Sequence, residues 1–306
     1  MTTDVLVIGS LNFDILIQQD RLPHLGETFT GNGMMMMPGG KGANQAVQCA
    51  RLGLTVNMVG CVGQDMYGQE LLQSLEKYQV ATQNIKRCGT SGVGIVQIMK
   101  EGDYCSTIIK GANYHITAAD LKDAFFSDRP LVILQSEIPP SVVDEAVKKA
   151  VRFGCTVLLN NAPAREIAAE TLRQVNYLVV NETEAAFMLG TPVKDVTQAN
   201  DAALQLSQRI NGTVIVTLGE KGAVVKSAEM LQHFPAKPCA NVVDTTGAGD
   251  AFIGALAWSL VRQRSLSEAI PFAASVSALA IQKYGGQSAF PTLSDIEAQQ
   301  VSANVT

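Results

Sequence analysis

The chain has 306 residues, of which 47% are apolar, and its formal net charge is -5. That length is enough for one large α/β domain, with or without a smaller insertion. The slightly acidic balance argues against a nucleic-acid-binding protein, which needs a basic surface to meet phosphates. No apolar run approaches the ~20 residues that span a bilayer. We therefore expect neither nucleic acid nor a membrane as a partner.

The first ten residues, MTTDVLVIGS, lack the basic segment of a signal peptide and lead directly into a strand-like run. This predicts a cytoplasmic protein. The cysteines form no C-x-x-C pair, so we expect buried free thiols rather than disulfides. The histidines are far apart, which argues against a zinc site or a Ser–His–Asp triad. These residues are Cys49, Cys61, Cys88, Cys105, Cys155 and Cys239, and His24, His115 and His233.

Short β-branched runs alternate with longer helical patterns along most of the chain. This alternation predicts a mostly parallel central sheet with helices on both faces. Helical spacing is evident in Ser141–Phe153 and Ala202–Ile210, and Ala248–Tyr284 has the pattern of two helices separated by Ser265–Ser267. The expected strands are Val5–Ile8, Val56–Val59, Leu131–Leu134, Thr156–Asn160, Tyr177–Val180 and Val214–Leu218.

Two regions interrupt the alternation. Residues 12–38 have little helical periodicity, and the strand-like runs Gly92–Met99 and Tyr104–Ile109 flank a turn signal at Lys100–Asp103. Paired with each other, these segments would form a small β lid over the carboxyl edge of the main sheet, where such folds bind ligands. We therefore divide the chain into a discontinuous lid, residues 12–38 and 92–110, and a main domain, residues 1–11, 39–91 and 111–306.

The segment DTTGAGDAF, residues 244–252, has the strongest chemical signature. Gly247 and Gly249 permit tight backbone geometry just before an apolar helix, whose first amides and dipole favour an anion. Asp250 lies in the first turn, beside that anion. A carboxylate there could accept a proton from an attacking hydroxyl while the amides stabilise a transferring phosphoryl group. Ordinary capping of a helix is the alternative.

Two further segments supply polar groups. In PGGKGANQA, residues 38–46, glycines allow close approach of the backbone to a ligand, and Lys41 and Asn44 offer polar contacts. The segment is neither a Walker A loop nor a dinucleotide fingerprint, and a glycine-rich turn before a helix at Ala43–Leu52 is the alternative. In GSLNFD, residues 9–14, Asn12 and Asp14 share one face at strand spacing, which suits a polyol. An Asx turn would also explain them.

The segment NETEAAFMLG, residues 181–190, follows an expected strand. Asn181 and Glu184 lie three residues apart, so a carboxylate at the strand end could hold Mg²⁺, usually through water, near nucleotide phosphates. Helix capping is the alternative. A glycine-flanked turn, TLGEKG at Thr217–Gly222, could contact a nucleotide or simply close a hairpin.

In this order, the four segments GGKGANQA, DTTGAGDAF, NETE and TLGEKG resemble the signature motifs of the ribokinase/phosphofructokinase-B superfamily of carbohydrate kinases. The resemblance covers nearly the whole chain. It implies an α/β domain with a small β lid that often forms a homodimer interface. It also implies ATP-dependent phosphorylation of a pentose, such as ribose, at its terminal hydroxyl, with ATP and Mg²⁺ as cofactors and K⁺ as a possible third.

The resemblance assigns roles to individual residues. Asp250 would be the catalytic base beside an anion hole of Gly247, Ala248 and Gly249. The sugar would contact Asn12, Asp14, Gly40, Lys41, Asn44, Glu137 and Asp250. The nucleotide would contact Asn181, Thr217, Gly219, Gly222 and Gly249, and Glu184 would help to position Mg²⁺ through water. A K⁺ ion would be held by Asp244 and by backbone carbonyls of Thr246, Ala280, Lys283 and Gly285.

The sequence departs from the family pattern at two positions. Ala289 stands where the family usually has a serine hydroxyl, so one oxygen ligand for K⁺ is missing and the K⁺ dependence would be weaker or completed by water. Asn161 replaces a usual proline near the active-site edge.

Several other functions stay open. Kinases for deoxyribose, another pentose or a nucleoside would share the scaffold and the base. Asn12 favours ribose, because its amide would hold ring hydroxyls that deoxyribose partly lacks. A dehydrogenase is disfavoured by the missing dinucleotide fingerprint. A non-catalytic sugar sensor would have no need of Asp250.

Overall fold

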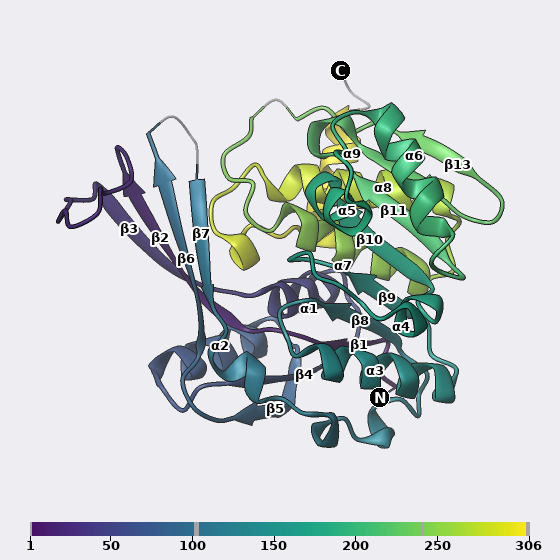
Figure 1. Ribbon diagram of the computed structural model, residues 1–306, viewed down its shortest axis with the longest axis horizontal. Helices are drawn as coiled ribbons and strands as arrows, with labels where there is room; N and C mark the ends of the chain where they lie inside the picture. The colour runs from purple at the N-terminus through teal and green to yellow at the C-terminus, as the bar shows by residue number, and fades with distance from the viewer. Residues whose placement is uncertain (1, 101–103, 240, 304–306) are drawn as a thin grey trace.

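A computed structural model of the protein describes residues 2–100, 104–239 and 241–303. A large sheet lies between two layers of helices, and a smaller sheet stands beside it, at the left of Figure 1. The predicted class, a mostly parallel sheet with helices on both faces and a small second sheet, is confirmed.

In the described part of the chain, the large sheet has nine strands. Its neighbours pair in parallel except at the edge formed by the last two strands, which pair in antiparallel fashion. In spatial order the strands are β13 (Leu231–Phe234), β12 (Ala223–Lys226), β11 (Thr213–Thr217), β10 (Tyr177–Asn181), β9 (Val157–Asn160), β8 (Leu131–Gln135), β1 (Val5–Ile8), β4 (Val56–Val62) and β5 (Ala81–Arg87).

Both faces of this sheet are covered. On β1, Val5 and Val7 pack into one apolar cluster, whereas Leu6 and Ile8 pack into another on the opposite face. Burial on both sides explains why the strand sequences are continuously apolar instead of alternating. One face carries α1 (Lys41–Arg51), α2 (Met66–Lys77), α7 (Ala248–Val261), α8 (Leu266–Ala280) and α9 (Leu293–Ala303). The other carries α3 (Pro140–Phe153), α4 (Ala169–Arg173), α5 (Glu182–Leu189) and α6 (Val196–Ser207).

The helix expected at Ala202–Ile210 instead spans Val196–Ser207, so that prediction was wrong by about two turns at its start. The side chain of Asp195 caps the helix by accepting a hydrogen bond from Gln198 N at 2.8 Å. An N-cap fixes where a helix begins even when the apolar periodicity becomes evident only later.

The two helices expected within Ala248–Tyr284 are present, but the second ends at Ala280. Ser265 forms a capping box with Glu268, so the helix begins at Leu266. Ser267 therefore belongs to α8 rather than to a linker.

The small sheet joins two distant parts of the sequence, as predicted. Its order is β3 (Gly33–Gly39), β2 (Asn12–Gln19), β6 (Gly92–Met99) and β7 (Tyr104–Ile109). The central pair, β2 and β6, is parallel, and the two outer pairs are antiparallel. Residues 101–103 of the expected turn between β6 and β7 lie outside the described residues.

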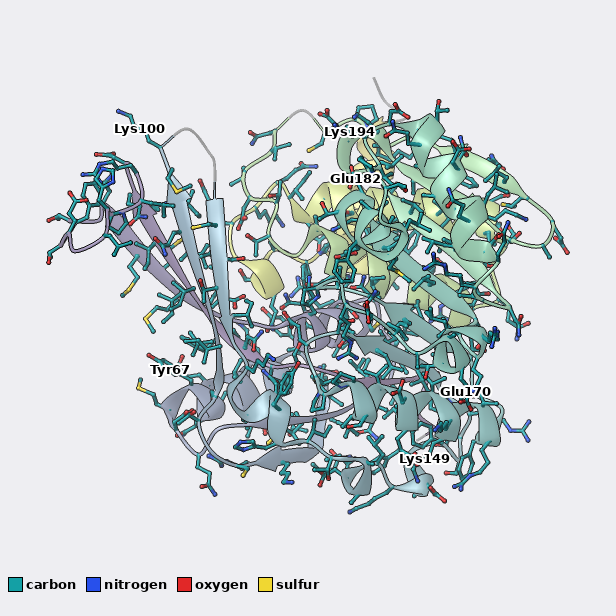
Figure 2. The ribbon with its side chains drawn as sticks, viewed as in Figure 1. Tyr67, Lys100, Lys149, Glu170, Glu182 and Lys194 are labelled. Carbon is teal, nitrogen blue, oxygen red and sulfur yellow. The ribbon has the colours of Figure 1, made fainter. Side chains whose placement is uncertain are left out.

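Charged side chains such as Lys100, Glu170 and Lys194 lie on the outside of the molecule (Figure 2). All six cysteines are free; Cys49, Cys61 and Cys155 are buried as expected, whereas Cys88, Cys105 and Cys239 are only half-buried. Among the residues that the structure describes, no helix is both long enough and apolar enough to cross a bilayer.

Candidate active site

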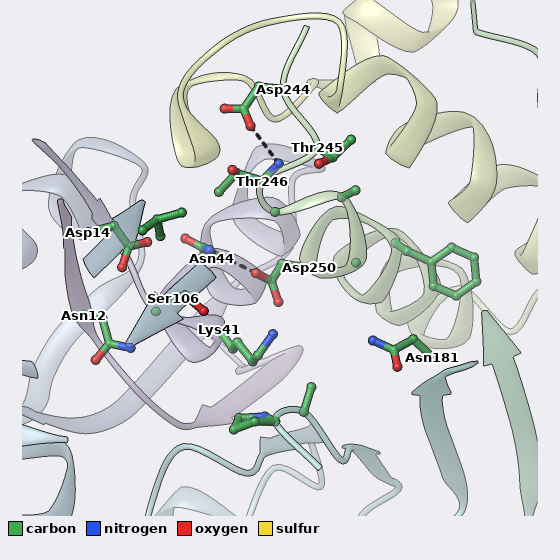
Figure 3. A pocket seen from close by; sticks show the side chains of 18 of the residues that line it. Asn12, Asp14, Lys41, Asn44, Ser106, Asn181, Asp244, Thr245, Thr246 and Asp250 are labelled. Atoms are coloured by element: carbon green, nitrogen blue, oxygen red, sulfur yellow. Dashed lines mark hydrogen bonds between the residues drawn. The ribbon is translucent and has the colours of Figure 1, made fainter. Parts of the chain in front are cut away.

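A cavity of ≈ 890 Å³ lies between the small sheet and the carboxyl ends of the parallel strands. The last residues of three neighbouring strands line it: Asn160 of β9, Asn181 of β10 and Thr217 of β11. Figure 3 shows Asn12 and Asp14 on one side, Asn181 on the other, and Lys41 and Asp250 between them. The predicted residues that the cavity brings together are Asn12, Asp14, Gly40, Lys41, Asn44, Glu137, Asn181, Glu184, Thr217, Asp244, Thr246, Gly247, Ala248, Gly249 and Asp250.

Five predicted site residues are not part of the cavity lining: Gly219, Gly222, Ala280, Lys283 and Gly285. The turn that contains Gly219 and Gly222 closes the antiparallel hairpin of β11 and β12. A side chain at Gly222 would overlap the backbone at Phe234 and Pro235, and φ is +93°. The close approach of this backbone therefore requires glycine at position 222.

Glycines bring the start of α1 against the end of β1. Gly40 has φ +87°, and a Cβ on it would lie 2.5 Å from Asn12 N. A Cβ on Gly42 would lie 2.6 Å from Ser10 N. Neither position accommodates a side chain, so the PGGKG segment can place Lys41 at the cavity only with glycine on both sides.

Glu137, which follows β8, fixes this junction. Its Oε2 accepts hydrogen bonds from Ser10 Oγ, from Lys41 N at 3.1 Å and from Asn12 Nδ2 at 3.4 Å. With three donors on one oxygen, the other oxygen is the one suited to a ligand. Asn12 is itself buried, and its Oδ1 accepts a hydrogen bond from Asn113 Nδ2 at 2.7 Å.

Asp14 lies on β2 between two glycines of neighbouring strands. A Cβ on Gly39 or on Gly94 would overlap its carboxylate, so both glycines make room for it. Burial, together with repulsion from Glu137 and Asp250, raises the pKa of Asp14 to about 7. The Asp14 side chain is only half-buried and lines the cavity, so its carboxylate can accept hydrogen bonds from ligand hydroxyls.

Asp250 occupies the first turn of α7 and is buried. Its Oδ2 accepts a hydrogen bond from Asn44 Nδ2 at 3.0 Å, and its Oδ1 accepts one from Gln45 Nε2 at 2.9 Å. Burial raises the pKa of Asp250, while Lys41 and these two amides act in the opposite direction. For Lys41, burial alone would lower the pKa, but attraction to Asp250, Glu137 and other carboxylates outweighs it and raises the pKa.

The helix start beside Asp250 is shaped for an anion. Gly247 caps α7 in the left-handed region with φ +79°. Ala248 N donates to Thr245 O at 3.2 Å, whereas the amides of Gly249 and Asp250 belong to the first turn, where helical N–H groups have no intrahelical acceptor. Of the predicted anion hole, Ala248 N is therefore already used within the loop.

On the opposite side of the cavity, Asn181 and Glu184 cap α5. Asn181 Oδ1 accepts from Glu184 N at 2.8 Å, and Glu184 Oε2 accepts from Asn181 N at 2.8 Å. This capping box leaves the amide nitrogen of Asn181 facing the cavity (Figure 3). Burial raises the pKa of Glu184. Asn181 and Glu184 thus cap α5 and also line the cavity.

The cavity carries more negative than positive side chains. Asp14, Glu137, Glu184, Asp244 and Asp250 are carboxylates, against the single ammonium of Lys41 among the residues that line it. This charge balance disfavours a free polyphosphate and fits a divalent cation bound along with it, with oxygen ligands of the kind Mg²⁺ prefers. In the described residues, no cluster of three acidic, histidine or cysteine ligands would hold a metal on its own, so phosphate oxygens and water would complete the shell.

The proposed K⁺ ligands lie on two adjacent loops joined through Asp244. Its Oδ1 accepts from Thr246 N at 2.9 Å, and its Oδ2 accepts from Gly285 N at 3.4 Å. The carboxylate therefore links the loop before α7 to the loop after α8. Ala289 is buried nearby and supplies no side-chain oxygen.

Asn161, which departs from the family pattern, links two loops at the cavity edge. Its Oδ1 accepts from Ser136 Oγ at 2.6 Å, and its Nδ2 donates to Arg165 O at 2.9 Å. The side chain is fully buried. Its amide thus joins the segments that follow β8 and β9.

Sequence reasoning placed Asn12 and Asp14 of the small sheet at the cavity but missed the other residues of this sheet that line it. Leu16 and Gln18 continue the alternation of Asn12 and Asp14 along β2, so strand spacing could have identified them. The remaining lining residues of this sheet are Met35, Val96, Ile98, Ser106 and Ile108. Their place follows from long-range pairing, which has no local signal.

The chain is similar to known proteins in both sequence and fold. A family model described as pfkB family carbohydrate kinase matches residues 2–293. The chain belongs to this family. It is therefore an ATP-dependent sugar kinase.

The chain is similar to characterised members over nearly its whole length. It is 38% identical to a ribokinase from Lactococcus lactis, covering 97% of each chain. It is 34% identical to a deoxyribokinase from Salmonella typhi, covering 95% of this chain and 96% of the other. The solved structure of Arabidopsis thaliana ribokinase complexed with ribose and ATP superposes with a TM-score of 0.89 at 29% identity, covering 97% and 98%.

The raised pKa of Asp14 predicts a pH-dependent stability. Since the pKa is about 7 in the folded kinase and 3.8 for an ordinary aspartate, ionisation of Asp14 destabilises the fold as pH rises between these values, with the full penalty above pH 7. Asp14→Asn removes that penalty. We expect its stability advantage in urea unfolding to be about 2 kcal/mol larger at pH 8 than at pH 5.

The exposed Asp201 of α6 gives the matched control, because Asp201→Asn should change the stability by less than about 0.5 kcal/mol. An Asp14→Asn variant with the same stability difference from the parent at both pH values would contradict the assigned environment of Asp14.

Proposed function

We propose that this kinase transfers the γ-phosphate of ATP to the 5-hydroxyl of D-ribose. The observation that carries the proposal is the position of Asp250. Its buried carboxylate lies at the start of α7, between the polar residues of β2 and the nucleotide-side residue Asn181 (Figure 3). A sugar hydroxyl and a terminal phosphate would meet at that point.

In this proposal the sugar lies against Asn12, Asp14, Lys41, Asn44 and Glu137. Asp250 accepts the proton of the attacking hydroxyl, which is worth roughly 10²–10⁴ in rate. The first amides of α7 and Lys41 stabilise the charge that develops on the transferring phosphoryl group. Transfer is direct and in line, without a covalent enzyme intermediate.

Two cations belong to the proposal. Glu184 would hold Mg²⁺ through water, and the ion would neutralise charge on the phosphates. K⁺ would be held by Asp244 and the carbonyls of Thr246, Ala280, Lys283 and Gly285, beside the amides that receive the anion. Since Ala289 provides no oxygen, we infer that water completes this shell or that K⁺ binds more weakly.

The small sheet supports two further proposals. Closed over the sugar, it would exclude water that otherwise hydrolyses ATP. Its exposed apolar side chains, Met34 and Met36 on β3 and Ile109 on β7, are 64%, 41% and 50% exposed. Such side chains are typical of an interaction surface, and we propose that they form a homodimer interface. We also propose a cytoplasmic location, in keeping with free thiols.

Deoxyribose is the second candidate substrate, because a deoxyribokinase is among the similar proteins. Asn12 favours ribose. Its amide lies in the cavity wall, where it is hydrogen-bonded to Asn113 and Glu137. A polar group there that is left without a hydrogen-bond partner would weaken binding, which disfavours a sugar that lacks the matching hydroxyl. A nucleoside or another sugar would use the same base.

The substrate is tested by ATP turnover against ribose, deoxyribose, fructose, other pentoses and nucleosides. We expect kcat/KM for ribose to exceed that for deoxyribose by about 100-fold or more, because a site built to pair a hydroxyl rejects an analogue that lacks it. If deoxyribose or a nucleoside is preferred, the assignment of ribose is wrong and the kinase class stands. No turnover with any of them would favour an untested substrate or a sensor.

The K⁺ site is tested by replacing K⁺ with tetramethylammonium in the same assay. We expect turnover to fall, and Ala289→Ser to lower the K⁺ concentration needed for half-maximal activation, because it restores an oxygen ligand. Asp244→Asn, which weakens the ligand set, should require more K⁺ than the parent. Equal turnover in both salts for the parent and for Ala289→Ser would rule the site out.

A further inference from the structure

Buried amide side chains surround the carboxylate of Asp250. Gln45 follows Asn44 on α1, is fully buried, and was not among the residues expected to act in catalysis. Its Nε2 donates two hydrogen bonds, to Asp250 Oδ1 at 2.9 Å and to Asn160 Oδ1 at 3.1 Å. Both hydrogens of this amide are therefore used, one at Asp250 and the other at Asn160.

The orientation of the Gln45 amide is fixed from two sides. Asn160 Nδ2 donates to Val179 O at 3.1 Å, and a carbonyl can only accept, so Asn160 Oδ1 must face Gln45. Gln135 Nε2 donates to Gln45 Oε1 at 2.7 Å. A flipped Gln45 amide would lose both bonds and turn an oxygen toward the carboxylate of Asp250.

The second oxygen of Asp250 is held by a similar chain. Asn44 Nδ2 donates to it, Gln287 Nε2 donates to Asn44 Oδ1 at 3.1 Å, and Ser74 Oγ donates to Gln287 Oε1 at 2.8 Å. Each carboxylate oxygen thus accepts one amide hydrogen whose direction is set by a further side chain. One lone pair per oxygen remains for the proton of a substrate.

We propose that Gln45, oriented by Gln135 and Asn160, is a positioning residue that keeps Asp250 ionised and directed at the reacting hydroxyl. Gln287 has the corresponding role through Asn44. The inference rests on the proposed function of Asp250 as the base. Hydrogen bonds to the charged form of a carboxylate favour that form, here against the cost of burial.

Charged groups face Asp250 from the other elements around it: Lys41 on α1, Asp14 on β2, Glu137 after β8 and Glu184 on α5. Lys41 favours the ionised base, and the three carboxylates oppose it. A substitution at Gln45 leaves all four in place. Its effect on the titration of the base therefore reports the hydrogen bonds of the Gln45 amide rather than a change in these charges.

The test is Gln45→Met, which removes both N–H donors while keeping a similar volume. We expect the acid limb of kcat, measured at saturating ribose and ATP, to move upward by about one pH unit. At pH values below the acid limb, kcat would be about tenfold lower than that of the parent, and at high pH it would recover to the parent's value. Saturating ribose separates this effect from the titration of Asp14 in the empty site. Gln48→Met is the matched control, because Gln48 is buried on the same helix but donates to Pro291 O.

An acid limb that stays in place in Gln45→Met, with only a lower Tm, would show that Gln45 merely fills space and would overturn the inference. If Gln45→Met does not fold, Gln287→Met provides the test. An acid limb that stays in place in Gln287→Met would overturn the inference that the buried amides keep Asp250 ionised. Asp250→Asn separates the two levels. If Asp250→Asn retains turnover, Asp250 is not the base. If Asp250→Asn loses turnover while the acid limb of Gln45→Met stays in place, only the role of Gln45 is wrong.

Discussion

The buried carboxylate of Asp250, held between α7 and α1, is the constraint on which the rest of the site depends. A charge in that position is costly unless it is hydrogen-bonded and faces an opposite charge. Asn44 and Gln45 supply the hydrogen bonds, and Lys41, from the same helix, supplies the charge. The start of α1 must therefore reach the start of α7.

The glycines before α1 satisfy that requirement. Because Gly40 and Gly42 allow the helix to abut the end of β1, one short segment joins the side of the cavity that holds Asn12 to Asp250. The start of α7 then contributes both the carboxylate and the amides beside it. A negative base next to an anion site is unfavourable in the absence of other charges, so the arrangement suits a substrate that arrives with its own cation.

Much of this was accessible from the sequence. Continuous apolar runs between helical patterns indicated the parallel sheet, and Asp250 after Gly249 indicated a carboxylate at an anion-binding helix start. Asn12 and Asp14 share a face on β2 as their spacing predicts. The beginning of α6 was misplaced because the cap at Asp195 carries the signal rather than the apolar periodicity.

Other features depend on contacts between distant segments. Gln45 has the sequence pattern of an ordinary helical residue, and only the approach of Asn160, Gln135 and Asp250 gives its amide a direction. The room for Asp14 is made by Gly39 and Gly94 on two other strands. Gly222 likewise has a reason that lies in a distant segment, because a side chain there would overlap the backbone at Phe234 and Pro235.

The measurement that tests the account most directly compares turnover with ribose binding in the Asp250→Asn variant. The substitution keeps the shape of the side chain and removes its ability to take a proton. We expect kcat to fall by about 10²–10⁴ or more, while the Kd for ribose from calorimetric titration changes only a few-fold. Equal loss of binding and turnover, or turnover near that of the parent, would contradict the role of Asp250 as the base.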